Sequence, residues 1–260
     1  MTDCKNCGTA FEGKFCPNCS QKADTHRLTL GHFAHETTHA VTHTDKGILL
    51  LIKEMFARPG IVAREYVEGK RKKYFNPITF LLILMAVQVY AVKKTDFYGK
   101  FTRTVQKAYE SMAKANAAST ENVTKFNKQM EKADKQAALA TDNNKLLTVI
   151  FIPLLALLTW LFFRKSGFNY AENLVFNVLI NGQLIVWFLM ICIIPVIIKS
   201  SLVVLVMYLY ILASWVYAII AYKQFYRQRW GLTIVKGLTL QVIYFLAISF
   251  TSSALISFID

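Results

Sequence analysis

The sequence predicts an all-α integral membrane protein with about five transmembrane helices. Hydrophobic residues make up 54% of the 260 residues and aromatic residues 13%, which is too apolar for an ordinary soluble domain. The polar N-terminal part becomes a membrane chain within residues 69–92. There, four consecutive basic residues and an aromatic pair precede Asn76-Pro77 and an uncharged run that ends at Val92. A basic flank, an interfacial aromatic pair and an apolar run are typical of a transmembrane helix, here predicted over 76–92.

The net charge of +14 is concentrated in this flank and in the segment 93–145. That distribution argues against a nucleic-acid-binding face and favours contact with anionic membrane lipids. The residues predicted to bind lipid headgroups are Lys70, Arg71, Lys72 and Lys73. The first twenty residues are polar and rich in cysteine, so we expect no cleavable signal peptide.

Residues 1–22 carry two CxxC pairs separated by eight residues, and the four thiols belong to Cys4, Cys7, Cys16 and Cys19. Four thiolates with this spacing can close a tetrahedral site for a structural Zn²⁺ ion, with no open position for hydrolysis. About twenty residues cannot bury a core, so the metal would supply the folding free energy. Redox pairs or disulfides are the alternatives, and a cytoplasmic location disfavours both. The sequence therefore predicts an N-terminal zinc ribbon.

All five histidines lie within the next predicted region, 23–75, which we expect to be cytoplasmic. Four of them would form one stripe on a helix: His32, His35, His39 and His43. His35-Glu36-x-x-His39 matches the HExxH signature of zinc metallopeptidases, but a histidine-rich window makes a chance match common. We therefore assign no catalytic residue here. A second metal site at the four histidines and a polar packing face remain the alternatives.

Two short amphipathic helices are predicted before the first span. Residues 48–56 place apolar side chains on one side and charged ones on the other, and residues 61–68 form the second helix after a stop at Arg58-Pro59-Gly60. The first of these helices is too short to span a bilayer. It either lies in the bilayer interface or docks on the transmembrane bundle.

The CxxC pairs, the segment THTDKG at 42–47 and the segment ARPGIVAREYVEGKRKKYFNPITFLLI at 57–83 together resemble a bacterial family of zinc-ribbon membrane proteins, domain of unknown function 3667. The resemblance covers the first ninety residues well and the remainder only in layout. It implies no established activity and no catalytic residue. It assigns to the family pattern His39, His43, Asp45, Arg58, Pro59, Gly60, Tyr66, Gly69, Lys70, Arg71 and Pro77.

The basic segment 93–145 has apolar residues at helical spacing, which predicts one broken helix or a helical hairpin with its break near Ser119-Thr120. A mobile charged linker is the alternative. Four more apolar runs follow in the predicted transmembrane region 146–260, at 146–163, 173–198, 202–222 and 232–259.

The charges of the short loops set the expected orientation in the bacterial cytoplasmic membrane. Basic residues follow the second and fourth runs, whereas Lys199 is the one charge between the third and the fourth. Because basic short loops stay in the cytoplasm, we expect a cytoplasmic N-terminus and an extracytoplasmic C-terminus. The basic segment 93–145 would then lie outside, which is acceptable because long loops translocate largely regardless of charge.

Four asparagines recur every four residues at the start of the third run and form a polar stripe: Asn169, Asn173, Asn177 and Asn181. They either bind neighbouring helices or line a polar cavity.

The sequence thus favours a protein that mediates interaction or sensing, with membrane lipids and a cytosolic protein as partners and no nucleic acid. A membrane-associated metallopeptidase and a small transporter or lipid-handling protein are the alternatives.

Overall fold

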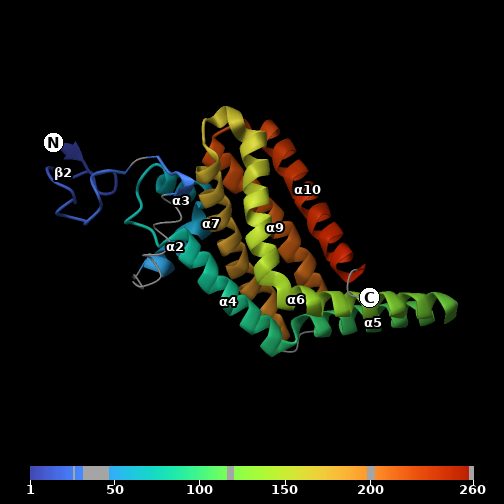
Figure 1. Cartoon of the computed structure of the whole chain (residues 1–260). Coiled ribbons are helices and arrows are strands. Elements are labelled where there is room, and N and C mark those ends of the chain that lie inside the picture. The colour runs from blue at the N-terminus through green and yellow to red at the C-terminus, as the bar shows by residue number, and fades with distance from the viewer. Residues whose placement is uncertain (26, 32–46, 116–119, 198–202, 258–260) are drawn as a thin grey trace. The chain divides into compact units, whose positions relative to one another are not determined.

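The chain is mainly helical in the computed structural model, which describes residues 1–25, 27–31, 47–115, 120–197 and 203–257 (Figure 1). It divides into two compact units. Unit 1 comprises Met1–Leu84, Phe151–Leu184 and Val216–Leu240, and unit 2 comprises Met85–Ile150, Ile185–Trp215 and Gln241–Asp260. The helical architecture agrees with the predicted all-α membrane protein.

Four helices in the described part of the chain are long and apolar enough to cross a membrane: Pro77–Thr95, Tyr170–Ile193, Val204–Tyr226 and Trp230–Ala247. They correspond to the first, third, fourth and fifth predicted spans. The predicted span 146–163 is helical along its length, as the end of α6 (Thr120–Phe163), but its side chains are described only from Ile150 onward. It is not among these four.

The N-terminal part of unit 1 has little regular structure. Strands β1 (Thr2–Asp3) and β2 (Ala10–Phe11) pair antiparallel, with Thr2 opposite Phe11. Cys4, Phe11 and Cys16 are buried together in a small cluster. Three side chains are too few to hold such a segment folded alone.

Helices α2 (Gly47–Ala57) and α3 (Pro59–Val67) follow. Helix α2 ends before Arg58, as predicted, but α3 begins at Pro59 and not at Ile61, because a proline at the first helical position has no N–H to leave unpaired. The apolar face of α2 is packed, since Leu51 and Met55 are fully buried. Tyr217 donates a hydrogen bond to the Met55 carbonyl at 2.9 Å, so α2 docks on the bundle.

Helix α4 (Pro77–Thr95) begins where the side-chain oxygen of Asn76 accepts the backbone N–H groups of Ile78 and Thr79, at 3.0 and 3.1 Å. In unit 1 the start of α4 is joined by parts of α6, α7 (Tyr170–Phe188), α9 (Val203–Tyr226) and α10 (Trp230–Ser257). Aromatic rings fill the space between them. The ring centroids of Phe163 and Tyr226 are 4.0 Å apart, and those of Phe176 and Phe225 are 4.5 Å apart.

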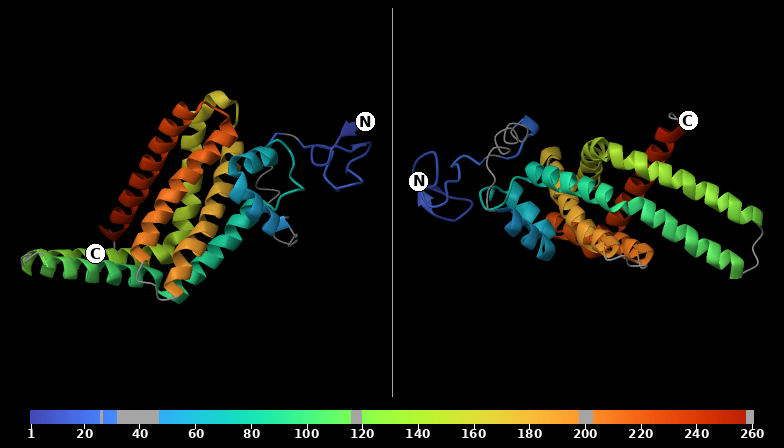
Figure 2. Two further views of the ribbon diagram at one scale, coloured as in Figure 1. Left: turned by 180° about the vertical axis from the view of Figure 1, so that it is seen from behind. Right: turned by 90° about the horizontal axis from the view of Figure 1, so that it is seen from below.

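Unit 2 contains a helical hairpin made of α5 (Phe97–Ala115) and the first part of α6. Both views of Figure 2 show these two helices side by side, in green. The rings of Tyr109 and Phe126 stack at 3.7 Å, and Asn127 donates to Glu110 at 3.1 Å. At the corner between α4 and α5, Asp96 has a φ of 48°.

The core of unit 2 lies at the base of this hairpin. Phe97 packs edge-to-face on Phe188, with ring centroids 5.2 Å apart, and Cys192 is buried beside them. Beyond α7 the chain continues as a π-helical turn, η2 (Leu189–Ile193), and the short helix α8 (Ile194–Ile197).

Candidate metal centre and juxtamembrane charge cluster

The four N-terminal cysteines form a compact cluster of free thiols. All four Sγ atoms lie within 4.8 Å of one another, with Cys4 and Cys19 at 3.5 Å and Cys7 and Cys16 at 3.6 Å. A tetrahedral Zn²⁺ ion with bonds of about 2.3 Å places its sulfur ligands about 3.8 Å apart. The four thiols therefore have the spacing of a metal site.

Two matching turns bring the thiols together. The N–H of Gly8 bonds the Cys4 carbonyl at 2.8 Å, and the N–H of Ser20 bonds the Cys16 carbonyl at 2.8 Å. Both Gly8 and Ser20 are left-handed, with φ of 76° and 59°. Each CxxC pair thus folds into the same knuckle, which turns its two thiols toward one point.

The two thiols of the first knuckle, Cys4 and Cys7, differ in how easily they ionise. Hydrogen bonding with the side chain and backbone of Thr9 lowers the pKa of Cys7 to about 6, whereas burial raises the pKa of Cys4 to about 11. The thiolate is the form that ligates a metal, and without a metal ion Cys7 ionises more readily than Cys4.

Gln21 fastens this segment to the stretch of chain just before α4. Its amide is 4% exposed, its nitrogen donates to the Gly69 carbonyl at 2.8 Å, and its oxygen accepts the backbone N–H of Lys72 at 3.2 Å. Because the backbone of Gln21 also bonds Cys16 at 2.8 Å, the second knuckle and the 69–72 segment are joined through one residue. We call this contact the Gln21 clamp.

A second attachment reaches the start of α7. Arg27 donates to both carboxylate oxygens of Glu172, each at 2.8 Å. Asn169 donates to the carbonyl of the fully buried Leu28 at 2.9 Å. A planar, two-pronged pair of this kind fixes orientation as well as distance.

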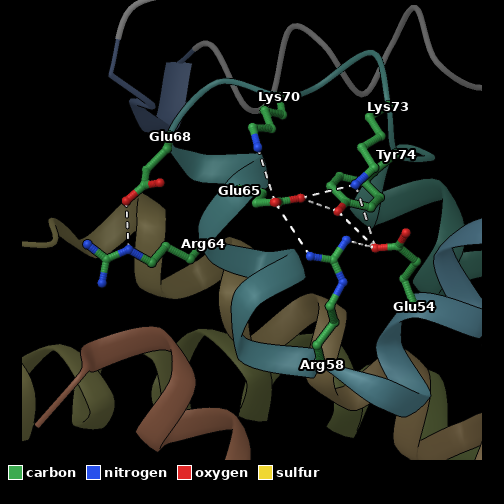
Figure 3. Close-up of polar contacts among 8 residues, drawn as sticks. All are labelled: Glu54, Arg58, Arg64, Glu65, Glu68, Lys70, Lys73 and Tyr74. Atoms are coloured by element: carbon green, nitrogen blue, oxygen red, sulfur yellow. Dashed lines mark hydrogen bonds and ion pairs between the residues drawn. The ribbon is translucent and has the colours of Figure 1, made fainter. Parts of the chain in front are cut away.

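Six residues between the end of α2 and the start of α4 form the juxtamembrane charge cluster, namely Glu54, Arg58, Glu65, Lys70, Lys73 and Tyr74 (Figure 3). Glu65 is its centre. Lys70 and Lys73 approach its carboxylate at 3.1 and 3.2 Å, Arg58 approaches at 3.6 Å, and the Tyr74 hydroxyl donates to it. Glu54 pairs with Arg58 and accepts from Tyr74 at 3.3 Å.

The cluster holds its carboxylates in the charged form. Burial acts against the charge of Glu65, but hydrogen bonds from Tyr74, Lys70 and Lys73 outweigh it and lower the pKa of this carboxyl to about 2. Burial and the neighbouring Glu65 together raise the pKa of Tyr74. At neutral pH the cluster is therefore a fixed set of ion pairs.

The structure gives the four residues of the basic flank different surroundings. Lys70 and Lys73 are committed to Glu65, whereas the side chain of Lys72 is exposed. A lipid-headgroup role for the flank remains a prediction.

The asparagine stripe lies along α7 in unit 1. Asn169 caps the helix, because its side-chain oxygen accepts the N–H of Glu172 at 2.9 Å while the Glu172 carboxylate accepts the N–H of Asn169 at 2.7 Å. The amide nitrogens of Asn173, Asn177 and Asn181 each donate to the carbonyl four residues earlier, at 2.7 to 2.8 Å.

Two of the stripe asparagines also contact other helices. Asn177 donates to the hydroxyl of Thr159 at 2.9 Å, and the Tyr226 hydroxyl donates to Asn173. All these bonds are contacts within and between packed helices, and they lend the cavity hypothesis no support.

Sequence reasoning missed Gln21, Arg27 and Glu172 as attachment residues. The pattern Asn169-x-x-Glu172 was a readable capping signal, but nothing local marks the other two. The predicted second metal site at the histidines, with the HExxH match, lies outside the described residues.

Fold and site together define a class: a helical protein with apolar helices suited to a membrane and an N-terminal cysteine cluster that can hold a metal ion. The family model described as Protein of unknown function (DUF3667) matches residues 45–89, which confirms the resemblance seen in the sequence. The matched segment includes α3 and all six residues of the juxtamembrane charge cluster. Comparisons with curated proteins and with solved structures gave no match.

Proposed function

We propose that this is an inner-membrane protein that senses or binds a cytosolic partner through a zinc ribbon and passes the state of the ribbon to the juxtamembrane helices α2 and α3. The observation that carries the proposal is the Gln21 clamp, because it joins a fold that needs metal to the segment entering the membrane. If the ribbon loses its ion, Gln21 loses the backbone support that positions its amide. Gly69 and Lys72 are then released.

Zinc is the metal of the proposal. Four thiolates, with no oxygen or nitrogen ligand among the described residues, favour Zn²⁺ in a closed structural site. Such an ion has no open position, so its role is to hold the ribbon fold.

The proposed topology has five spans, in which the helical stretch 146–163 of α6 is the second span in chain order. The N-terminus lies in the cytoplasm and the C-terminus outside. Arg164 and Lys165 in one short connection, and Arg227 and Arg229 in another with Lys223 in the last turn of α9 before it, support it. The ribbon would then meet cytosolic partners directly.

Neither alternative function gains an observation from the described residues. The HExxH segment lies outside them, and the stripe asparagines are bonded within the bundle. No enzymatic activity is proposed.

The metal is tested on the purified full-length chain. We expect one zinc per chain in the wild type and none after Cys16→Ser with Cys19→Ser, because two thiolates cannot close the site. Cys192→Ser is the control, since that thiol lies among unit 2 core residues. Full zinc in the double variant would refute the site, and a zinc that persists without all four cysteines would locate a second site elsewhere.

The coupling is tested by hydrogen exchange at the Lys72 amide, whose N–H donates to Gln21. Both metal removal and Gln21→Ala should speed its exchange, whereas Gln129→Ala, at an exposed position of α6, should not. If metal removal leaves Lys72 exchange unchanged while Gln21→Ala speeds it, the clamp exists but does not respond to the metal. The sensing proposal then fails, although the zinc site stands.

A further inference from the structure

The α5–α6 hairpin carries a row of lysines that its own acidic residues do not neutralise. On α5, Lys100, Lys107 and Lys114 are seven residues apart and exposed. Seven residues are close to two helical turns, so the three ammonium groups lie along one line, about 10.5 Å from one to the next. On α6, Lys128 and Lys132 are exposed one turn apart.

These lysines lie on the sides of the hairpin that its helices do not use to contact each other. On α5, Phe101 and Tyr109 are only partly exposed, and Tyr109 stacks on Phe126 of α6. In helical projection the row at Lys100 and Lys107 points well over 90° away from Tyr109. The packed face therefore leaves the lysine row open.

Three acidic residues of the hairpin, Asp96, Glu110 and Glu121, are engaged elsewhere. Asp96 pairs with Arg103, and Glu121 pairs with Lys125 at 2.6 Å. Glu110 accepts hydrogen bonds from Gln106 and Asn127 at 3.4 and 3.1 Å. Among the residues whose side chains are described, the five lysines of the two rows have no carboxylate partner.

Like charges spaced at one turn repel each other within a helix, as at Lys128 and Lys132. Binding of an external anion reduces the repulsion between these lysines. The segment 93–145 contains eleven basic residues against six acidic ones, so the whole hairpin attracts negative charge.

The position of the row in the chain points to the source of that charge. Helix α4 is one of the four helices suited to crossing a membrane, and it ends at Thr95. The chain turns at Asp96, and Lys100 follows within about one helical turn of the corner. That distance is within the Debye length of about 8 Å at physiological salt. A lysine so close to the end of a span is exposed to the potential of anionic headgroups.

We propose that the hairpin binds the anionic phospholipid headgroups of the membrane that α4 crosses, with the row Lys100, Lys107 and Lys114 on α5 as its main contact. The site is separate from the basic flank at the other end of α4. It does not depend on the zinc proposal or on which side of the membrane the hairpin lies.

The test places the full-length protein in lipid nanodiscs made of phosphatidylcholine alone or mixed with phosphatidylglycerol, and measures hydrogen exchange along α5. We expect phosphatidylglycerol to slow exchange of α5 amides by roughly fivefold or more, the factor for one lysine–headgroup contact. High salt should remove the effect. The triple change of Lys100, Lys107 and Lys114 to glutamine should abolish it, and the same three changes to arginine should preserve it.

The salt comparison uses the wild-type chain alone, so the proposal stays testable even if a variant misfolds. Equal exchange of α5 in the two lipids would overturn it. Protection by added soluble polyphosphate, with none from phosphatidylglycerol, would also overturn it and identify a soluble polyanion as the ligand.

Discussion

Glu65 is the residue on which the polar contacts of the juxtamembrane segment converge. Its carboxylate meets Arg58, Lys70, Lys73 and the Tyr74 hydroxyl, although its side chain is only 16% exposed. A partly buried carboxylate is favourable only if such donors replace the water it loses. The positive charges of the basic flank are therefore part of the fold, in addition to any contact they make with lipids.

Replacement of Glu65 by glutamine should destabilise the protein by about 1–3 kcal/mol. Three cationic side chains and the buried Tyr74 hydroxyl would then lose the negatively charged carboxylate that they all contact. Glu68 is the matched control. It pairs with Arg64 at 2.6 Å but is 52% exposed, so Glu68→Gln should change stability by no more than about 0.5 kcal/mol. Thermal unfolding in detergent measures both, and equal effects would show that the cluster contributes no more than a surface pair.

The same residue predicts a pH dependence. The pKa of Glu65 is about 2 in the folded chain and 4.5 ordinarily, so the folded state favours the charged form. Its stabilising contribution is complete above pH 4.5 and is lost as the pH falls from 4.5 toward 2. Across that window the melting temperature of the wild type should fall more steeply than that of Glu65→Gln. Parallel curves would contradict the assigned shift.

At the scale of elements, two contacts hold α3 against the end of α9. The N–H of Gly60 bonds the Gln224 side chain at 2.9 Å, and Arg64 donates to the Phe225 carbonyl at 3.0 Å. That carbonyl belongs to the last turn of α9, which has no partner within its own helix. The arginine also places positive charge at the negative end of the helix dipole.

Gly60→Ala should weaken this contact strongly. An added Cβ would lie 2.6 Å from the Gln224 side chain and 2.7 Å from the Phe225 backbone nitrogen, and backbone cannot move aside cheaply. We expect a loss of about 1–3 kcal/mol. Gly231→Ala, in α10 with open space around it, should be neutral or slightly stabilising. Unchanged unfolding of Gly60→Ala would mean that α3 does not pack on α9 as described.

At the scale of the whole molecule, the prediction concerns the orientation of the chain in the membrane. Reporter fusions at Ser119 and after Asp260 should both be extracytoplasmic, with a fusion at Met1 as the cytoplasmic control, because the short basic loops stay inside. A cytoplasmic reporter at Ser119 would reverse the proposed topology. A cytoplasmic reporter at Asp260 alone would remove one span from the proposed five.

The sequence by itself determined the cysteine cluster, the amphipathic helices and the four apolar helices suited to a membrane, because each depends on a local pattern. Two residues between cysteines form one knuckle, helical periodicity marks α2, and the length of an apolar run marks a span. The start of the second helix was predicted two residues too late, at Ile61 and not at Pro59, since a proline is compatible with both a stop and a first turn.

Only the tertiary structure decided how these parts are fastened together. Gln21 lies 48 positions from Gly69, Arg27 lies 145 from Glu172, and Gly60 lies 164 from Gln224. The sequence around a single amide or guanidinium does not indicate which distant group it will bond. The hydrogen bond depends on where the fold brings the two groups. The sequence indicates which helices and turns form, whereas polar contacts between distant segments decide which of them are attached to one another.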